Sequence, residues 1–277
     1  MQWLWLIIVG ILGLIFGSFW SVILLRLGEI PTRKTLKGFL FWRSYCPKCH
    51  HSLHAKDLVP LMSFLLQWGK CRYCKKKISR LYPFLEIITA GIFMAVFGYF
   101  GFSNLLFSSI LALILWLCLI VALYDILHFE LHLIATIGVF VLSLFLAIDQ
   151  WKIWDFFLWV GIVSIVFLAI YFFSQYFCYL KYHERKEGFW LWDVIFSASI
   201  WGLFPLFVTI NTPLDSAYLL LSFVISCCFF WIFYYTWARC FSKKKEIWSS
   251  ILPFLPSMVM SVFLMVFFGE KILSFLQ

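Results

Sequence analysis

The chain has 277 residues, of which 64% are hydrophobic and only 13% are charged, and its formal net charge is +9 at pH 7. A soluble domain of this length does not carry so large a share of apolar side chains. The composition therefore excludes a soluble globular protein and indicates a polytopic membrane protein.

Apolar runs along the chain predict about eight membrane-spanning helices, because a backbone inside the bilayer core must satisfy its own hydrogen bonds. The first run has neither a basic segment before it nor a small-residue cleavage site, so we interpret it as a retained helix and not as a signal peptide. The predicted fold is an all-α polytopic membrane protein with a small insertion after the first helix. The runs lie at about residues 1–25, 83–102, 104–124, 131–149, 156–180, 191–210, 216–238 and 249–269.

Lysine and arginine are unevenly distributed between the two sides of these spans. If the N-terminus lies outside the cell, the segments 26–82, 181–190 and 239–248 face the cytoplasm and hold 20 of the 22 Lys and Arg residues. The positive-inside rule therefore predicts this orientation. Topology and attraction to anionic lipid account for the positive charge, so we expect no nucleic-acid partner.

Residues 26–82 form the one sizeable segment outside the membrane, and it contains two Cys-x-x-Cys pairs. Cys46 and Cys49 form the first pair, and Cys71 and Cys74 form the second. This spacing is typical of a tetrahedral four-cysteine zinc site. The alternative is two disulfides or cysteines without a role, and the predicted cytoplasmic location disfavours disulfides because that compartment is reducing. Three histidines nearby are interpreted as surface residues, since four thiolates already complete the coordination shell; they are His50, His51 and His54.

A zinc ion held by four thiolates has no open coordination position, so it is structural and performs no hydrolysis. The chemistry must then lie elsewhere. Three carboxylates are expected in helices or at helix ends near the cytoplasmic boundary, namely Glu86, Asp125 and Asp193. A carboxylate at membrane depth is costly and needs a reason.

Asp125 and Asp193 are predicted to lie at the same depth, which suggests an aspartyl protease. One ionised carboxylate would take a proton from water while the other, protonated, donates to the scissile carbonyl. The alternatives are structural. Asp193 could cap the N-terminus of a helix, and Asp125 could be a polar residue in a tight turn between helices.

Several separate stretches resemble one known family, the bacterial prepilin peptidases, which are membrane aspartyl proteases with a GxGD motif and are also called type IV prepilin leader peptidases/N-methyltransferases. The stretches are "GSFWSVILLRL" (17–27), the two cysteine pairs, "ISRLYPFLEIITA" (78–90), "YDILH" (124–128), "GFWLWD" (188–193) and "LPFLPSMVM" (252–260). The resemblance implies three parts: a first transmembrane helix at 1–25, a cytoplasmic zinc module at 26–82, and a seven-helix membrane domain at 83–277.

The resemblance places the two catalytic roles on Asp125 and Asp193. It also carries over Glu86, His128 and Gly188, as residues that contact the substrate or support the catalytic pair. The second motif is divergent, because tryptophans replace two of its glycines, at positions 190 and 192. Glycine at such positions lets backbone or substrate approach closely.

The expected function is removal of the leader peptide from type IV pilin-like precursors at the cytoplasmic face of the bacterial inner (plasma) membrane. The partners are therefore a pilin-like precursor and the lipid bilayer. N-methylation of the new N-terminus with S-adenosylmethionine follows from the resemblance alone, because no glycine-rich methyl-donor loop is recognisable. Two alternatives stay open: a catalytically degenerate member that assists pilin assembly, and a transporter with an aspartate relay.

Overall fold

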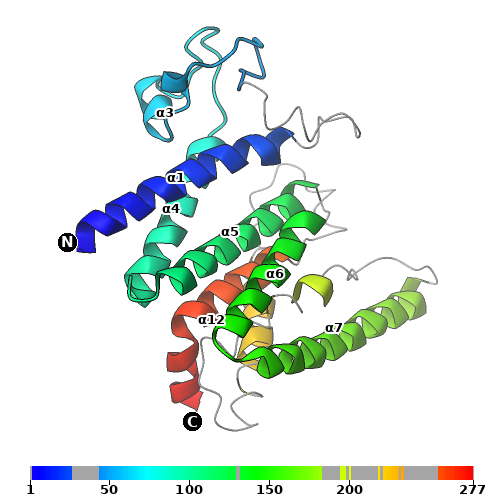
Figure 1. Ribbon diagram of the computed structural model, residues 1–277. Helices are drawn as coiled ribbons and strands as arrows, with labels where there is room; N and C mark the ends of the chain where they lie inside the picture. Colours follow the sequence, from blue (N-terminus) through cyan, green and yellow to red (C-terminus); the bar gives the residue numbers. More distant parts are fainter. Residues whose placement is uncertain are drawn as a thin grey trace. The chain divides into compact units, whose positions relative to one another are not determined.

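The computed structural model describes residues 2–26, 44–128, 132–182, 194–197, 200, 218, 221–230, 232–233 and 255–276. The chain divides into two units, Met1–Ala112 and Leu113–Gln277. In the described residues all regular structure is helical, apart from two isolated bridges in the cysteine-containing segment (Figure 1). The prediction of an all-α polytopic membrane protein is confirmed.

Four helices within the described ranges are long and apolar enough to cross a membrane. Their apolar stretches are Trp3–Ser21, Leu81–Phe100, Leu105–His128 and Ile153–Phe173. Two more apolar helices are shorter, Leu133–Asp149 and Leu221–Phe230. Six of the eight predicted spans thus coincide at least in part with these helices, and the span predicted at 249–269 overlaps the helix Leu255–Leu276. The one expected at about 191–210 lies mostly outside the described residues.

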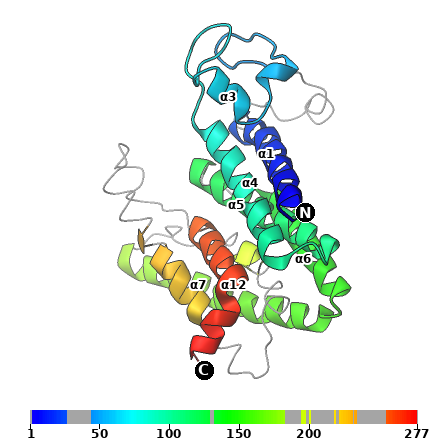
Figure 2. The ribbon, with the colours of Figure 1, turned by 90° about the vertical axis from the view of Figure 1, so that its left-hand side faces the viewer.

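In the first unit, α1 (Gln2–Arg26) packs antiparallel against α4 (Leu81–Phe100), as both views show (Figures 1 and 2). Glycines allow the two backbones to approach closely. A Cβ added at Gly13 would lie 2.6 Å from the Cα of Ala90, and one added at Gly17 would lie 2.8 Å from the Cα of Glu86. This is the small-residue packing typical of membrane helices.

Between α1 and α4 lies the cysteine-containing segment, which carries the short 3-10 helix η2 (Ala55–Asp57) and the five-residue helix α3 (Met62–Leu66). Helix α4 begins at Leu81, two residues before the predicted start, although its first turn contains Pro83. Proline is tolerated there because the first N–H groups of a helix have no partner within the helix.

Helix α5 (Leu105–His128) begins in the first unit and ends in the second, and α6 (Leu133–Asp149), α7 (Ile153–Tyr182) and α12 (Leu255–Leu276) belong to the second. A tight turn joins α6 to α7, in which Trp151 has a φ of 56° and Lys152 N–H donates to the carbonyl of Ala147 at 2.8 Å. The described helix α12 overlaps the span predicted at 249–269 and carries Pro256 near its N-terminal end, where proline is compatible with a helix.

Candidate metal centre and membrane carboxylates

The two cysteine pairs are built as two copies of one turn. In the first copy, Cys46 N–H donates to the carbonyl of His51 at 3.0 Å, and His50 N–H donates to the carbonyl of Cys46 at 2.8 Å. In the second copy, Cys71 and Lys75 make the same two bonds, at 2.9 and 3.0 Å. These bonds hold both sulfurs of each pair on the same side of their turn. Each copy is closed by one bridge, between Tyr45 and Ser52 in the first and between Lys70 and Lys77 in the second.

Both turns contain a non-glycine residue in the left-handed region, immediately after the second cysteine. His50 has a φ of 55° and Lys75 has a φ of 59°. A left-handed conformation costs such residues about 1–2 kcal/mol each. A metal ion bound by the cysteines of both turns would offset this cost.

The four sulfurs of the two turns lie close together. The Sγ atoms of Cys46, Cys49, Cys71 and Cys74 all lie within 4.8 Å of one another, and no disulfide links them. Tetrahedral zinc with Zn–S bonds of about 2.3 Å places sulfurs about 3.8 Å apart, which lies within this limit. The donor set therefore fits a structural zinc ion. The neighbouring histidines His50, His51 and His54 are exposed and are not part of this group, as the sequence predicted.

The thiols of the first pair titrate unequally. Burial raises the pKa of Cys46, but hydrogen bonds from the backbone N–H groups of Lys48 and Cys49 and from neighbouring thiols outweigh it, and the pKa falls to about 7. For Cys49, a backbone hydrogen bond from His51 lowers the pKa, whereas burial and the thiols around it raise the pKa to about 11. A cationic metal would remove this inequality, because it binds thiolates and displaces their protons.

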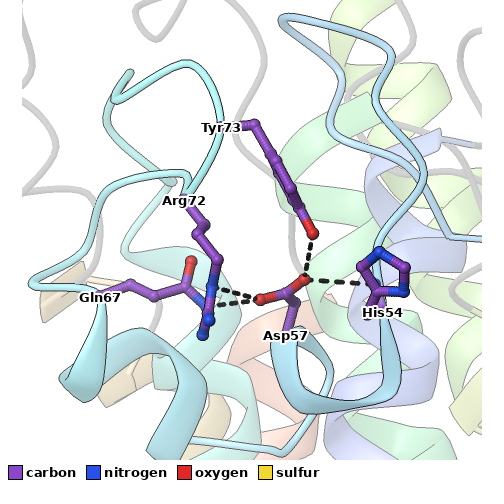
Figure 3. A network of polar contacts seen from close by, with 5 residues as sticks. All are labelled: His54, Asp57, Gln67, Arg72 and Tyr73. Carbon is purple, nitrogen blue, oxygen red and sulfur yellow. Dashed lines mark hydrogen bonds and ion pairs between the residues drawn. The ribbon is translucent and has the colours of Figure 1, made fainter.

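A buried carboxylate stabilises the segment between the two turns (Figure 3). The side chain of Asp57 is only 2% exposed and forms an ion pair with Arg72 Nε at 2.9 Å. The Tyr73 hydroxyl donates to Asp57 Oδ2 at 3.0 Å, and the His54 backbone N–H donates to the same atom at 3.2 Å (Figure 3). Gln67 Nε2 donates to Oδ1 at 3.4 Å. One carboxylate thus ties η2 to the second cysteine turn and to the end of α3.

Opposing effects act on the pKa of Asp57. Burial raises it, but the hydrogen bonds from Tyr73 and His54 and the charge of Arg72 outweigh burial and hold the pKa of the carboxyl below its usual value. The contribution of this network to stability is therefore present above the ordinary carboxyl pKa of about 3.9 and is lost only as the pH falls through the lower folded value.

Glu86 connects the cysteine-containing segment to the membrane helices. It lies in the second turn of α4 and is only 6% exposed. Its Oε2 accepts a hydrogen bond of 2.7 Å from the backbone N–H of Leu61, and its carboxylate also bonds to the Ser18 side chain of α1. Leu61 has a φ of 58° and precedes α3 directly. Glu86 therefore joins α1, α4 and the start of α3.

Asp125 lies in the last turn of α5 and is 8% exposed. Helix α5 continues to His128, so the alternative that places Asp125 in an interhelical turn is wrong: the helix extends one turn further than its apolar run. The ring of Tyr124 lies 4.6 Å from that of His128 and 5.1 Å from that of His132, centroid to centroid. Asp125 is thus a buried residue, and its sequence neighbour Tyr124 packs against two imidazole rings.

His132 begins the next helix. Its Nδ1 accepts a hydrogen bond of 3.1 Å from the backbone N–H of Ala135, so the side chain caps α6. The cap fixes the tautomer, because a nitrogen that accepts this bond carries no proton. Asp193 and Gly188, like Trp190 and Trp192, lie outside the described residues, so the distance between the two predicted catalytic carboxylates stays a prediction.

A comparison with family models identifies the N-terminal part of the chain. Residues 11–100 match the model described as the bacterial peptidase A24 N-terminal domain. This stretch includes most of α1, the four cysteines and all of α4. Residues 11–100 are therefore similar to that domain.

Curated relatives carry consistent names. The chain is 40% identical over 124 residues to the prepilin leader peptidase/N-methyltransferase of Bacillus subtilis, covering 45% of this chain and 46% of the relative. It is 42% identical over 92 residues to the protein of the same name from Vibrio cholerae, covering 31% and 35%. A protein from Pseudomonas aeruginosa with that name is 31% identical over 110 residues, covering 34% of this chain and 38% of its own length. The chain thus matches less than half the length of these relatives, and no solved structure matches it.

Within residues 11–100, the structure shows contacts that the sequence did not reveal. Asp57 stood out only as an acidic residue in a basic segment, and its partners Arg72 and Tyr73 follow at least 15 residues later. The bond between Glu86 and Leu61 spans 25 residues. Of these features, the sequence indicated only the paired turns, because Cys46 and Cys71 each begin a Cys-x-x-Cys pair.

Proposed function

We propose that this chain is a membrane aspartyl endopeptidase that removes the leader peptide from type IV pilin-like precursors. The observation that carries the proposal is the match of residues 11–100 to the A24 N-terminal domain, together with relatives of 31–42% identity named prepilin leader peptidases/N-methyltransferases. The substrate would be a pilin-like precursor, because the names of those relatives state prepilin processing. The proposed division keeps the three parts expected from the sequence, at 1–25, 26–82 and 83–277.

The proposed catalytic pair is Asp125 and Asp193. A water molecule between the two carboxyl groups would lose a proton to the ionised carboxylate as its oxygen bonds to the scissile carbonyl carbon. The protonated partner would donate its proton to the carbonyl oxygen. Collapse of the tetrahedral intermediate would break the C–N bond, with the leaving nitrogen taking a proton from the first carboxyl and one hydroxyl of the intermediate returning its proton to the second carboxylate. The burial of Asp125 supports this role, since two close carboxyl groups retain one proton between them most readily away from bulk water.

His128, Gly188 and Glu86 are proposed supporting residues. His128 lies one turn after Asp125 on α5, with its ring against Tyr124. Gly188 would allow close approach of the chain before Asp193. Glu86 would be a positioning residue that holds the start of α3 and α1 in place, because its carboxylate already binds Leu61 N–H and Ser18.

The proposed metal is a structural zinc ion held by Cys46, Cys49, Cys71 and Cys74, supported by their mutually close sulfurs. When bound, it would fix the two turns and contribute no open coordination position. We place the N-terminus outside the bacterial inner (plasma) membrane and the zinc module in the cytoplasm, on the distribution of Lys and Arg. Methyl transfer from S-adenosylmethionine is supported by the relatives' names alone.

A non-enzymatic assembly factor is the second candidate. Trp190 and Trp192, which replace glycines of the second motif, are the observation in its favour. A tryptophan needs far more room than a glycine, and its indole N–H requires a partner. Retention of both aspartates favours the peptidase.

Co-expression with a pilin-like precursor from the same genome tests the proposal. Leader removal is followed by the mass of the product, for the wild type and for Asp125→Asn and Asp193→Asn. Both variants should lose cleavage at least about 1000-fold, because each removes one half of the acid–base pair. Asp149→Asn is the matched control, since the same substitution there changes an exposed aspartate at the far end of α6.

Methylation is read in the same spectra, as a product heavier by one methylene. Cleavage that survives both aspartate substitutions would contradict the catalytic pair. A wild-type protein that binds zinc, folds and leaves the precursor uncut would support the assembly factor instead.

A further inference from the structure

The segment around α3 has its apolar side chains outside and its polar ones inside. The polar side chain of Gln67 turns inward to Asp57, and Ser63 is half-buried. On the outer side, Leu66 is 72% exposed and Trp68 is 89% exposed. We call the exposed set the α3 apolar surface; its members are Leu58, Val59, Met62, Leu65, Leu66 and Trp68. Contiguous exposed apolar residues of this kind indicate a surface that is covered in the working protein.

The position of α3 relative to the bilayer follows from one hydrogen bond. Leu61 N–H, directly before α3, binds the Glu86 carboxylate at 2.7 Å. Glu86 is the sixth residue of the spanning helix α4, which places its Cα about 8 Å along the axis from the start of that helix. The start of α3 therefore lies within about two turns of the point where α4 begins. Interfacial helices bury their apolar faces to about 5–10 Å at this level of a bilayer.

The surface of α4 at this level is apolar as well. Phe84 and Ile87, on either side of Glu86 in sequence, are both exposed in the described unit. In a spanning helix such side chains contact lipid. The α3 apolar surface thus lies at the same depth as a lipid-facing part of α4.

The basic residues that follow α3 in sequence indicate what kind of partner covers the α3 apolar surface. Residues 70–80 carry no acidic side chain and, besides Arg72, which pairs with Asp57, five exposed basic ones: Lys70, Lys75, Lys76, Lys77 and Arg80. A cluster of four to eight Lys and Arg residues next to a spanning helix attracts anionic headgroups. The same charge would repel a cationic peptide.

We propose that the α3 apolar surface inserts into the boundary between headgroups and acyl chains of an anionic bilayer, on the side where α4 begins. Trp68 then lies at the level of the interfacial tryptophans of membrane proteins. The basic residues 70–80 contact the headgroups beside it. This inference requires only that α4 spans the membrane, so it stands or fails independently of the peptidase activity.

Labelling of the unmodified full-length protein from the lipid tests the proposal. The protein is placed in nanodiscs of phosphatidylcholine with about 30% phosphatidylglycerol and a trace of lipid that carries a diazirine close to the headgroup. After illumination, labelled peptides are identified by mass spectrometry. Peptide 58–68 should carry at least ten times more label per residue than the first cysteine turn, residues 44–53. The exposed face of α4 serves as the positive control.

A second arm tests the surface itself. Trp68→Glu, combined with Leu66→Glu, should reduce labelling of peptide 58–68 at least fivefold and leave α4 unchanged. Label on α4 with only background label on peptide 58–68 would overturn the proposal, since another protein surface would then cover α3. Suppression of the lipid label by an added pilin-like precursor would overturn it too, in favour of a substrate-docking surface.

Discussion

The packing of α1 against α4 makes a graded prediction for glycine-to-alanine substitutions. At Gly13 an added Cβ would lie 2.6 Å from a backbone atom, the Cα of Ala90. At Gly10 it would lie 3.0 Å from the Sδ at the flexible end of Met94. At Gly91, on α4, nothing lies within 4 Å of the added atom. The same added methyl group would therefore contact backbone at Gly13, a flexible side chain at Gly10 and no atom at Gly91.

Two opposing effects set the change in the free energy of unfolding. Alanine improves helix propensity over glycine by about 1 kcal/mol, and this gain is common to all three positions. At Gly13 the contact must lengthen by about 1 Å to reach ordinary carbon–carbon separation, and because the obstacle is backbone, the helices themselves must move apart. Forced overpacking of this kind costs about 1–3 kcal/mol. The free energy of unfolding of Gly13→Ala should therefore be about 1–3 kcal/mol below that of Gly91→Ala, with Gly10→Ala in between.

Titration with sodium dodecyl sulfate in dodecylmaltoside micelles, followed by far-UV circular dichroism, measures the order of stability. Gly91→Ala is the matched control, because it isolates the propensity gain. Equal stability of Gly13→Ala and Gly91→Ala would refute the close contact between α1 and α4. A larger loss at Gly10 than at Gly13 would refute the argument that backbone obstacles cost more than flexible side chains.

Three further predictions concern the polar contacts. Asp57→Ala leaves the partners of a buried carboxylate unsatisfied and should speed zinc release to a chelator at pH 7, whereas Asp155→Asn, at an exposed helix end, should not change the rate. The apparent zinc affinity should rise with pH from 7 to 9, about tenfold per unit from Cys49 alone, because its thiol, with a pKa of about 11, must lose a proton to bind; a flat profile in competition titrations would contradict this. His132→Ala should lower the stability of α6 by about 0.5–2 kcal/mol through loss of the N-cap, and His132→Asn should restore most of it, measured by hydrogen exchange of the first turn.

The sequence predicted the four-cysteine group because the ligand spacing is local. Each Cys-x-x-Cys pair lies within one turn, so its geometry depends on a few neighbouring residues. That the two pairs meet is a tertiary result, and it depends on the chain between them. Asp57 holds this intervening segment through Arg72 and Tyr73, and no periodicity in the sequence links those positions.

Helix positions followed from the apolar runs, but helix ends did not. Hydropathy ends where charges begin, whereas a helix ends where its backbone bonds end. Helix α5 therefore continues to His128 and contains Asp125, and α4 begins at Leu81, ahead of Pro83. The sequence also did not predict that His132 caps α6, since histidine is not a characteristic capping residue.

By itself, the sequence determined the class of the protein and predicted that the four cysteines form one group, because these follow from composition and from residues close together in the chain; it also predicted the catalytic aspartates. Only the tertiary structure decided how closely α1 approaches α4, and that Glu86 binds Leu61 and so holds α3 beside a spanning helix. The physical reason is that such contacts join residues far apart in sequence. Their free energy depends on distances between backbones, which no local pattern of residues specifies.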